Sequence, residues 1–285
     1  MSDNLDPAAF DPAAFDPAAL FGAYMRITGT PSLEPEPDPD PGLAGKTLGL
    51  INGSSWVSLW ASYFGRTILP GVKLVNVGSD AVQLNFMRAH REGRPVPPQE
   101  NIDLFVAYAG QLVSLAAVDA ILITCSTMNR SAEAVRSATA RHRVPVVQID
   151  EPMMEAAVLR GGRILVVATH GPTVDNTQAL LHETADGLGT SVSVTGATVE
   201  EAFDLLGSGD VHAHNRLLET VIRRNLAGGG VDSVVLAQLS MSVFAFDHPD
   251  PVAGFGVPVF TSGREGFRRV REILTGERPV SAPGD

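Results

Sequence analysis

The strongest constraint on the fold is an internal repeat of strand-like segments. The segment Val118-Asp-Ala-Ile-Leu-Ile-Thr-Cys-Ser-Thr-Met128 reappears 113 residues later as Val231-Asp-Ser-Val-Val-Leu-Ala-Gln-Leu-Ser-Met241. Val144-Pro-Val-Val and Val257-Pro-Val-Phe are also 113 residues apart, and 47–54 matches 163–170 at an offset of 116. Three apolar segments in the same order, twice, predict two similar halves.

Helix-like segments alternate with the apolar segments in each half, and this alternation is typical of parallel sheets. We therefore predict an α/β fold with two pseudo-symmetric three-layer lobes and an active site in the cleft between them. The expected division is an acidic, proline-rich tail over 1–45, a first lobe over 46–158 joined by a C-terminal helix within 263–285, and a second lobe over 159–262. Strands are expected at 47–51, 72–77, 121–124, 144–149, 164–168, 191–195, 233–237 and 257–260, and helices near 56, at 102–117, 129–143, 152–160 and 176–188, up to about 226, and at 265–275.

Composition narrows the protein class. The single cysteine excludes an intrachain disulfide, and neither a secretory signal nor an apolar run long enough to cross a bilayer is found, so a cytoplasmic protein without a membrane partner is expected. The net charge of −11 argues against nucleic acid as a partner. Self-association into a homodimer or a higher homo-oligomer is compatible with the sequence.

The N-terminal segment is set apart by its composition. Residues 1–44 hold eight acidic residues and one basic residue, and 4–20 repeat Asp-Pro-Ala-Ala-Phe/Leu with a period of five. Proline at that spacing suits short turns or the first position of a helix, and the Glu-Pro/Asp-Pro run at 34–41 favours an extended chain. A disordered or extended tail is expected, with docking of Phe10, Phe15 and Phe21 on a partner subunit as the alternative.

Cys125 is the main candidate for chemistry. It follows a predicted strand and precedes a predicted helix, where backbone N–H groups and the helix N-terminus would stabilise a thiolate. Thr124, Ser126 and Thr127 flank it, which is unusual company for a buried structural cysteine. A thiolate of lowered pKa can remove a proton next to a carboxylate and return one.

Other strand ends supply uncharged hydrogen-bond donors. Such groups at helix N-termini, facing one another across a cleft, could hold a carboxylate. For each of them, capping of a helix is the competing interpretation. The candidates for substrate binding are Asn52, Ser54, Ser55, Ser126, Thr127, Thr169, Thr173 and Ser240, with His170 as a candidate acid or base.

Thr124-Cys125-Ser126-Thr127 and the paired halves resemble the aspartate/glutamate/hydantoin racemase superfamily. Ile149-Asp-Glu-Pro-Met153, Gly162-Arg-Ile-Leu-Val-Val-Ala-Thr169 and Leu236-Ala-Gln-Leu-Ser-Met241 strengthen the resemblance, which covers about 46–275. It implies two α/β lobes, a small carboxylic-acid substrate between them and no cofactor.

The sequence departs from that family at Gln238. Racemases of the family place one cysteine on each face of the α-carbon, and Gln238 occupies the position of the second cysteine. An amide cannot exchange a proton at neutral pH, although it can donate a hydrogen bond to an enediolate. The resemblance extends to one-thiol relatives that decarboxylate arylmalonates or isomerise maleate-like diacids.

Three functions follow as alternatives. The first is a cofactor-independent racemase or isomerase-like enzyme that acts beside a carboxylate, with Cys125 as acid, base or nucleophile. The second is a decarboxylase or lyase. The third is a non-catalytic two-lobed protein that binds a small acid. A thiol pKa well below about 8.5 is expected of an enzyme, and a higher pKa or an unreactive buried thiol of a binding protein.

Overall fold

The computed structural model describes residues 16–28, 40–169 and 171–277. Its strands are β1 (Thr47–Asn52), β2 (Lys73–Gly78), β3 (Ala120–Ile123), β4 (Val146–Gln148), β5 (Arg163–Ala168), β6 (Ser193–Thr198), β7 (Ser233–Leu236) and β8 (Val259–Thr261). Its helices are α1 (Pro17–Thr28), α2 (Ser55–Ile68), α3 (Asp80–Arg91), α4 (Gln99–Ala116), η2 (Ser126–Ser131), α5 (Ala132–Thr139), η3 (Ala140–His142), α6 (Glu151–Arg160), α7 (Gly171–Gly187), α8 (Glu200–Gly207), α9 (Val211–Ala227), η4 (Leu239–Phe246), α10 (Pro251–Phe255) and α11 (Ser262–Thr275). No helix among these described residues is both long and apolar enough to span a membrane.

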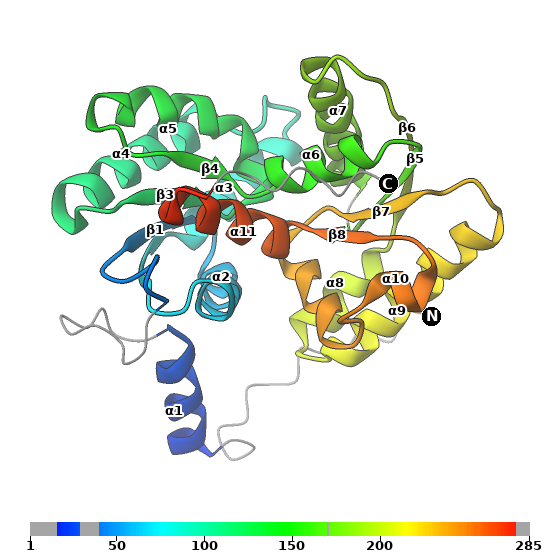
Figure 1. Ribbon diagram of the computed structural model, residues 1–285, viewed down its shortest axis with the longest axis horizontal. Helices are drawn as coiled ribbons and strands as arrows, with labels where there is room; N and C mark the ends of the chain where they lie inside the picture. The colour runs from blue at the N-terminus through cyan, green and yellow to red at the C-terminus, as the bar shows by residue number, and fades with distance from the viewer. Residues whose placement is uncertain (1–15, 29–39, 170, 278–285) are drawn as a thin grey trace.

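The strands form two four-stranded parallel sheets with the same topology. The first has the order β2-β1-β3-β4 and the second β6-β5-β7-β8 (Figure 1). β3 and β7 begin 113 residues apart, as do β4 and β8, and β1 and β5 begin 116 apart, so the offsets of the sequence repeat are those of the two sheets. The predicted α/β fold with two lobes is confirmed.

Each sheet is covered on both faces, which makes each lobe three-layered. Leu48, Leu50 and Leu122 face α2 and α11, whereas Ile51, Ile121 and Ile123 face α4 and α5. The second sheet repeats this arrangement, with one face against α6 and α7 and the other against α8, α9 and η4. Alternate residues of a strand point to opposite faces, so these continuously apolar strands bury both.

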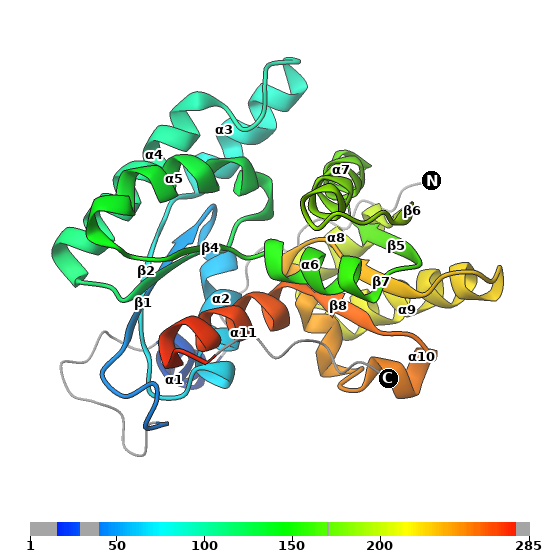
Figure 2. The same ribbon diagram turned by 45° about the horizontal axis from the view of Figure 1, so that its top comes forward.

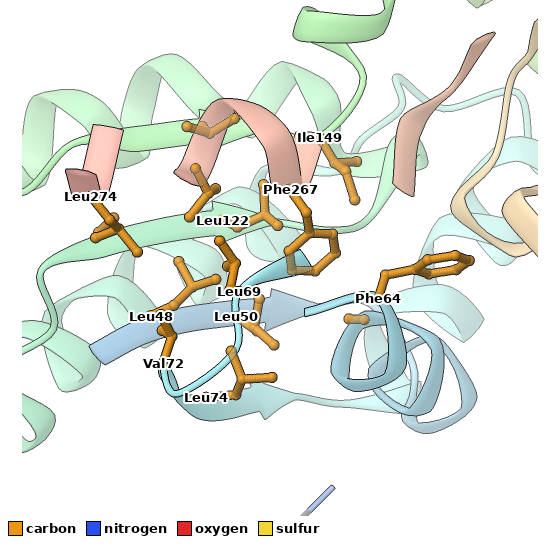
Figure 3. Close-up of a cluster of buried hydrophobic side chains, with 14 of the residues drawn as sticks. Leu48, Leu50, Phe64, Leu69, Val72, Leu74, Leu122, Ile149, Phe267 and Leu274 are labelled. Carbon is orange, nitrogen blue, oxygen red and sulfur yellow. The ribbon is translucent and has the colours of Figure 1, made fainter. Parts of the chain in front are cut away.

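The helix that follows each sheet packs into the core of the other lobe. Phe267 of α11 is buried against Leu48, Leu122 and Ile149 of the first lobe (Figure 3). Met153 and Ala157 of α6 are buried in the core of the second lobe. The two helices lie side by side across the junction (Figure 2). The expected division put 151–158 in the first lobe, whereas α6 packs into the core of the second. Which segments fold as independent units stays a prediction.

Two expectations from the sequence are wrong in local detail. No helix is among those expected between 78 and 100, yet this stretch contains α3, whose buried Val82 and Ala89 and part-buried Phe86 repeat at helical spacing. The helix expected at 129–143 is shorter, because a 3₁₀ turn, η2, comes first and α5 ends at Thr139.

The N-terminal segment also contains regular structure. α1 begins at Pro17, a residue suited to the first turn of a helix, and it packs on α2, where the Arg66 side chain donates to the Ile27 carbonyl at 2.7 Å. The expected disordered or extended tail is therefore wrong for 17–28. Phe21 is 65% exposed, so it is not buried against any of the described residues. Phe10, Phe15 and the Glu-Pro/Asp-Pro run up to Pro39 lie outside the described residues.

Candidate active site

Cys125 and Gln238 occupy equivalent positions in the two lobes. Cys125 follows β3 and precedes η2, and Gln238 follows β7 and precedes η4. Both residues have extended backbone geometry at the start of a 3₁₀ helix. Because ligands of parallel α/β sheets bind beyond the carboxyl ends of the strands, both side chains lie where a ligand is expected.

A small cavity of about 90 Å³ brings the two residues together. Trp56, Phe86 and Phe203 contribute aromatic walls, from α2, α3 and α8. Its polar lining comes from both lobes and is made of Ser54, Gln83, Thr124, Cys125, Ser126, Thr127, Thr173, Gln238 and Ser240.

The Cys125 sulfur is closely packed on its inner side. Thr127 Oγ1 lies 3.2 Å from it. The loop after β1 passes so near that a Cβ on Gly53 would come within 2.4 Å of the sulfur. The sequence alone did not lead us to Gly53, although a glycine directly after a buried strand is a known signal of close backbone approach.

Burial raises the pKa of the Cys125 thiol above its ordinary value. Hydrogen bonds from Thr127 and from the backbone of Met128 and Thr127 lower this pKa, but they do not offset the loss of solvation, and the charge of Asp150 adds to the rise. The lowered pKa expected of an enzyme is therefore not found, and the raised pKa is the one expected of a binding protein. The thiol is protonated at neutral pH, because the aromatic walls remove the water that would stabilise its charge.

Gln238 is held in one orientation by Thr169. Its Oε1 accepts hydrogen bonds from the Thr169 N–H at 2.9 Å and from the Thr169 hydroxyl at 2.8 Å. A backbone N–H can only donate, so the oxygen of the amide must face Thr169 and the NH₂ group faces the other way. The Gln238 NH₂ group is thus available as a donor to a ligand in the cavity.

Five predicted substrate-binding residues line this cavity: Ser54, Ser126, Thr127, Thr173 and Ser240. Ser54 takes the N-cap position of α2 but its hydroxyl makes no capping hydrogen bond, so it is free for a ligand. Ser126 is already engaged, since its hydroxyl donates to Asp150 Oδ1 at 2.9 Å.

Three other predicted residues have different tasks. Asn52 is buried and bonded to Asn76 and Thr124, and Ser55 donates to Asp80 at the start of α3. Thr169 is a positioning residue for Gln238. None of the three is among the residues that line the cavity. His170 lies outside the described residues.

A second cavity of about 210 Å³ adjoins the first and shares Phe86, Met87, Ser126, Thr127 and Thr173 with it. Asp150, at the start of α6, is 1% exposed and lies in its wall. Burial raises the pKa of the Asp150 carboxyl to about 6, against lowering contributions from its hydrogen bonds to Gln148 and Ser126. Sequence reasoning missed Asp150, because an acidic residue beside a helix start usually reads as a cap. Among the described residues, no group of three or more His, Cys, Asp or Glu is placed to hold a metal.

Two parallel-sheet lobes with a thiol and an amide at matching strand ends, and a cavity lined by both lobes, define a class of pseudo-symmetric α/β protein. The sequence over residues 79–270 matches the Asp/Glu/hydantoin racemase family. The chain belongs to this family.

Solved structures share the fold at low sequence identity. An aspartate racemase homologue from Pyrococcus horikoshii is 17% identical, with a TM-score of 0.59 over 81% of this chain and 99% of that one. Glutamate racemase from Francisella tularensis, solved with D-glutamate, is 16% identical, with a TM-score of 0.57 over 81% of each chain. Allantoin racemase from Klebsiella pneumoniae is 17% identical, with a TM-score of 0.54 over 84% of this chain and 97% of that one. No match is found among curated proteins.

Proposed function

We propose that this protein is a cofactor-independent enzyme that transfers a proton at the carbon next to the carboxylate of a small organic or amino acid. The observation that carries the proposal is the shared cavity of Cys125 and Gln238, with the Gln238 NH₂ group turned away from Thr169. The solved structures described as an aspartate racemase homologue, a glutamate racemase and an allantoin racemase support action on a small acid or a related compound.

In the proposed mechanism the neutral donors hold the substrate's carboxylate. Gln238, Ser54, Thr173 and Ser240 line the cavity and carry no charge. Donors of this kind stabilise the enediolate more than the ground-state carboxylate, because negative charge on the oxygens increases in the transition state. Loss of one such donor typically costs about 10²–10³-fold in rate.

Proton transfer is assigned to Cys125 alone. The resting thiol first gives its proton to solvent, and the Cys125 thiolate then takes the α-proton, so that the electron pair of the C–H bond forms the enediolate. After its proton exchanges with solvent, the same thiol returns a proton to the α-carbon from the same face. Gln238 on the other side cannot exchange a proton. The proposed reaction therefore gives a single enantiomer when a new stereocentre forms.

Decarboxylation is a second candidate, favoured by the protonated resting thiol. In that reaction the bond between the α-carbon and one carboxylate breaks, its electron pair forms the enediolate and CO₂ leaves. The Cys125 proton then adds to the α-carbon. A protonated donor is ready for this sequence, whereas removal of a proton first requires a thiolate.

Turnover decides between these enzymes and a binding protein, because a raised thiol pKa is also what is expected of a binding protein. Small mono- and dicarboxylic acids, including 2-substituted malonates, are incubated with the protein in D₂O. NMR then follows deuterium at the α-carbon, and CO₂ release is measured in parallel. We expect one of the two signals in the wild type and its loss in Cys125→Ala. If Cys125→Ala keeps full activity and stereochemistry, the thiol is structural; if no acid reacts but acids bind, the protein is a binder.

A further inference from the structure

The larger cavity is lined in part by residues that have no role in the proposed proton transfer. Phe86, Met87 and Val96 form apolar walls, and Asn129 and Asp150 contribute oxygen acceptors. Its volume of about 210 Å³ is several times what one water-sized group requires. The cavity therefore suits a chain with an apolar stem and a polar end.

One acceptor in this wall has no donor. Asn129 Oδ1 is buried and makes no hydrogen bond. A buried carbonyl oxygen without a partner is unfavourable, so native proteins rarely leave one unless a ligand or water supplies the donor. The Asn129 oxygen has almost no accessible area, so an N–H group of a ligand in the cavity would reach it after a rotation of the Asn129 side chain.

Asp150 in the same wall is a buried carboxylate without a counter-ion. It accepts hydrogen bonds from Ser126 Oγ at 2.9 Å and from Gln148 Nε2 at 2.8 Å, and both donors are neutral. No lysine or arginine lines the cavity, and no ion pair of Asp150 occurs among the described residues. The adjacent Glu151 has its own partner in Arg136.

The remaining charged groups at the cavity do not neutralise Asp150. Glu200 on α8 and His90 on α3 also line it, and both are exposed. Glu200 adds a second negative charge at the rim. A buried charge is normally paired, so the missing partner is a cation.

We propose that this cavity binds the positively charged end of the substrate's side chain, an ammonium or guanidinium group on an apolar stem. The assignment rests on the proposed function for the position of the substrate's carboxylate in the smaller cavity. Since Ser126, Thr127 and Thr173 line both cavities, one molecule reaches from the Cys125–Gln238 cavity to Asp150. The substrate class is then basic amino acids and ω-amino acids.

Four ligands separate the two ammonium positions: hexanoate, norleucine, 6-aminohexanoate and lysine. Norleucine adds only the α-ammonium to hexanoate, 6-aminohexanoate adds only the distal one, and lysine has both. Calorimetric dissociation constants are measured on full-length Cys125→Ser protein at pH 7.5, so that no turnover interferes. We expect 6-aminohexanoate to bind about tenfold or more tightly than hexanoate, and lysine to bind about tenfold or more tightly than norleucine. The reason is that the distal ammonium forms charge-assisted hydrogen bonds.

Variants of the wall test whether this gain comes from the cavity. Asn129→Leu and Asp150→Asn should each reduce the advantage of 6-aminohexanoate over hexanoate by at least about fivefold, a fraction of the value of one charge-assisted bond. Asn129 makes no side-chain hydrogen bond among the described residues, so Asn129→Leu should fold even if Asp150→Asn is disturbed next to Gln148. Glu201→Gln is the matched control, because Glu201 is an exposed neighbour of Glu200 and is not among the residues that line the cavity.

The proposal is overturned if the distal ammonium gives no gain, if the gain follows the α-ammonium alone, or if it survives in Asn129→Leu. Failure of the proposed function looks different. Basic ligands would then bind with the expected preference while the wild type exchanges no α-proton and releases no CO₂. If acids with and without a distal cation are turned over with equal kcat/KM, the proposed function stands and the assignment of this cavity fails.

Discussion

Gly53 lies where the loop after β1 passes the sulfur of Cys125. A methyl group at this position would meet the sulfur at 2.4 Å, well inside van der Waals contact. We expect Gly53→Ala to displace the thiol, to cost about 1–3 kcal/mol of stability through overpacking, and to lower kcat by tenfold or more, since a shift of about 1 Å in a reacting group is costly.

The matched control for this change is Gly110→Ala in α4, where an added methyl group meets nothing within 4 Å. Helix propensity predicts that this variant is more stable by up to about 1 kcal/mol, with unchanged turnover. Urea unfolding and the steady-state rate on the substrate found by screening check both variants. Equal rates for Gly53→Ala and the wild type would show that the sulfur need not sit against this loop.

Asp150 should give the protein a specific pH dependence of stability. Its pKa is raised from 3.8 to about 6 by burial, so the folded protein holds this proton more tightly than the unfolded chain does. The contribution is fully present below pH 4 and is lost as the pH rises through 6, a decline of about 3 kcal/mol.

The comparison of wild type and Asp150→Asn isolates this contribution. The free energy of unfolding in urea is measured from pH 4 to pH 7, and the variant is expected to lack the decline that Asp150 causes. Parallel curves for the two proteins would mean that the Asp150 carboxyl titrates alike in the folded and unfolded chains.

At the scale of elements, α11 follows the second lobe in the sequence but packs into the core of the first lobe. Phe267 is fully buried among residues of β1, β3 and α2. We expect Phe267→Ala to destabilise the protein by about 3–5 kcal/mol. Hydrogen exchange should show a larger loss of amide protection in β1 and β3 than in β5 and β7.

Arg268→Ala serves as the control, since the adjacent Arg268 is exposed and its change should cost no more than about 0.5 kcal/mol. If Phe267→Ala instead exposed β5 and β7 first, α11 would stabilise the second lobe in solution.

α1 is attached far more weakly than α11. It contains no buried residue, and Leu20, Phe21 and Tyr24 are more than half exposed. Deletion of 1–28 should therefore leave Tm nearly unchanged. Deletion of 1–41 should lower Tm more than deletion of 1–28 does, because it also removes Asp40, which pairs with the part-buried Arg271. A changed oligomeric state in the shorter deletion, measured by light scattering, would show that the exposed aromatic residues of α1 contact another copy.

At the scale of the whole molecule, the two lobes place Cys125 and Gln238 in the lining of one cavity. The pseudo-symmetry of the lobes predicts that the two residues face opposite sides of a bound substrate, and hence a change in stereochemistry. Gln238→Cys supplies a thiol on the second face, so the variant should racemise the product or increase its racemisation. In a Cys125→Ala background the same change should favour the opposite enantiomer, at a low rate. Chiral chromatography of the product checks both. Unchanged handedness in the double variant would mean that Cys125 and position 238 do not face opposite sides of the substrate.

The sequence alone determined the architecture and the central pair of this protein. A repeat of buried strands at constant offset permits little else than two similar parallel sheets, and parallel strands bring their carboxyl ends to one edge. The equivalence of Cys125 and Gln238 follows from that repeat without any knowledge of the surrounding side chains.

Only the tertiary structure decided which polar groups face the cavity and how the thiol ionises. Ser54 and Ser55 are neighbours in sequence, yet Asp80 of another element binds Ser55 and leaves Ser54 to the cavity. The protonated state of Cys125 and the unpaired charge of Asp150 depend on burial by distant segments such as α3 and α8. Desolvation and side-chain direction are set by residues far apart in the chain, and local patterns do not contain them.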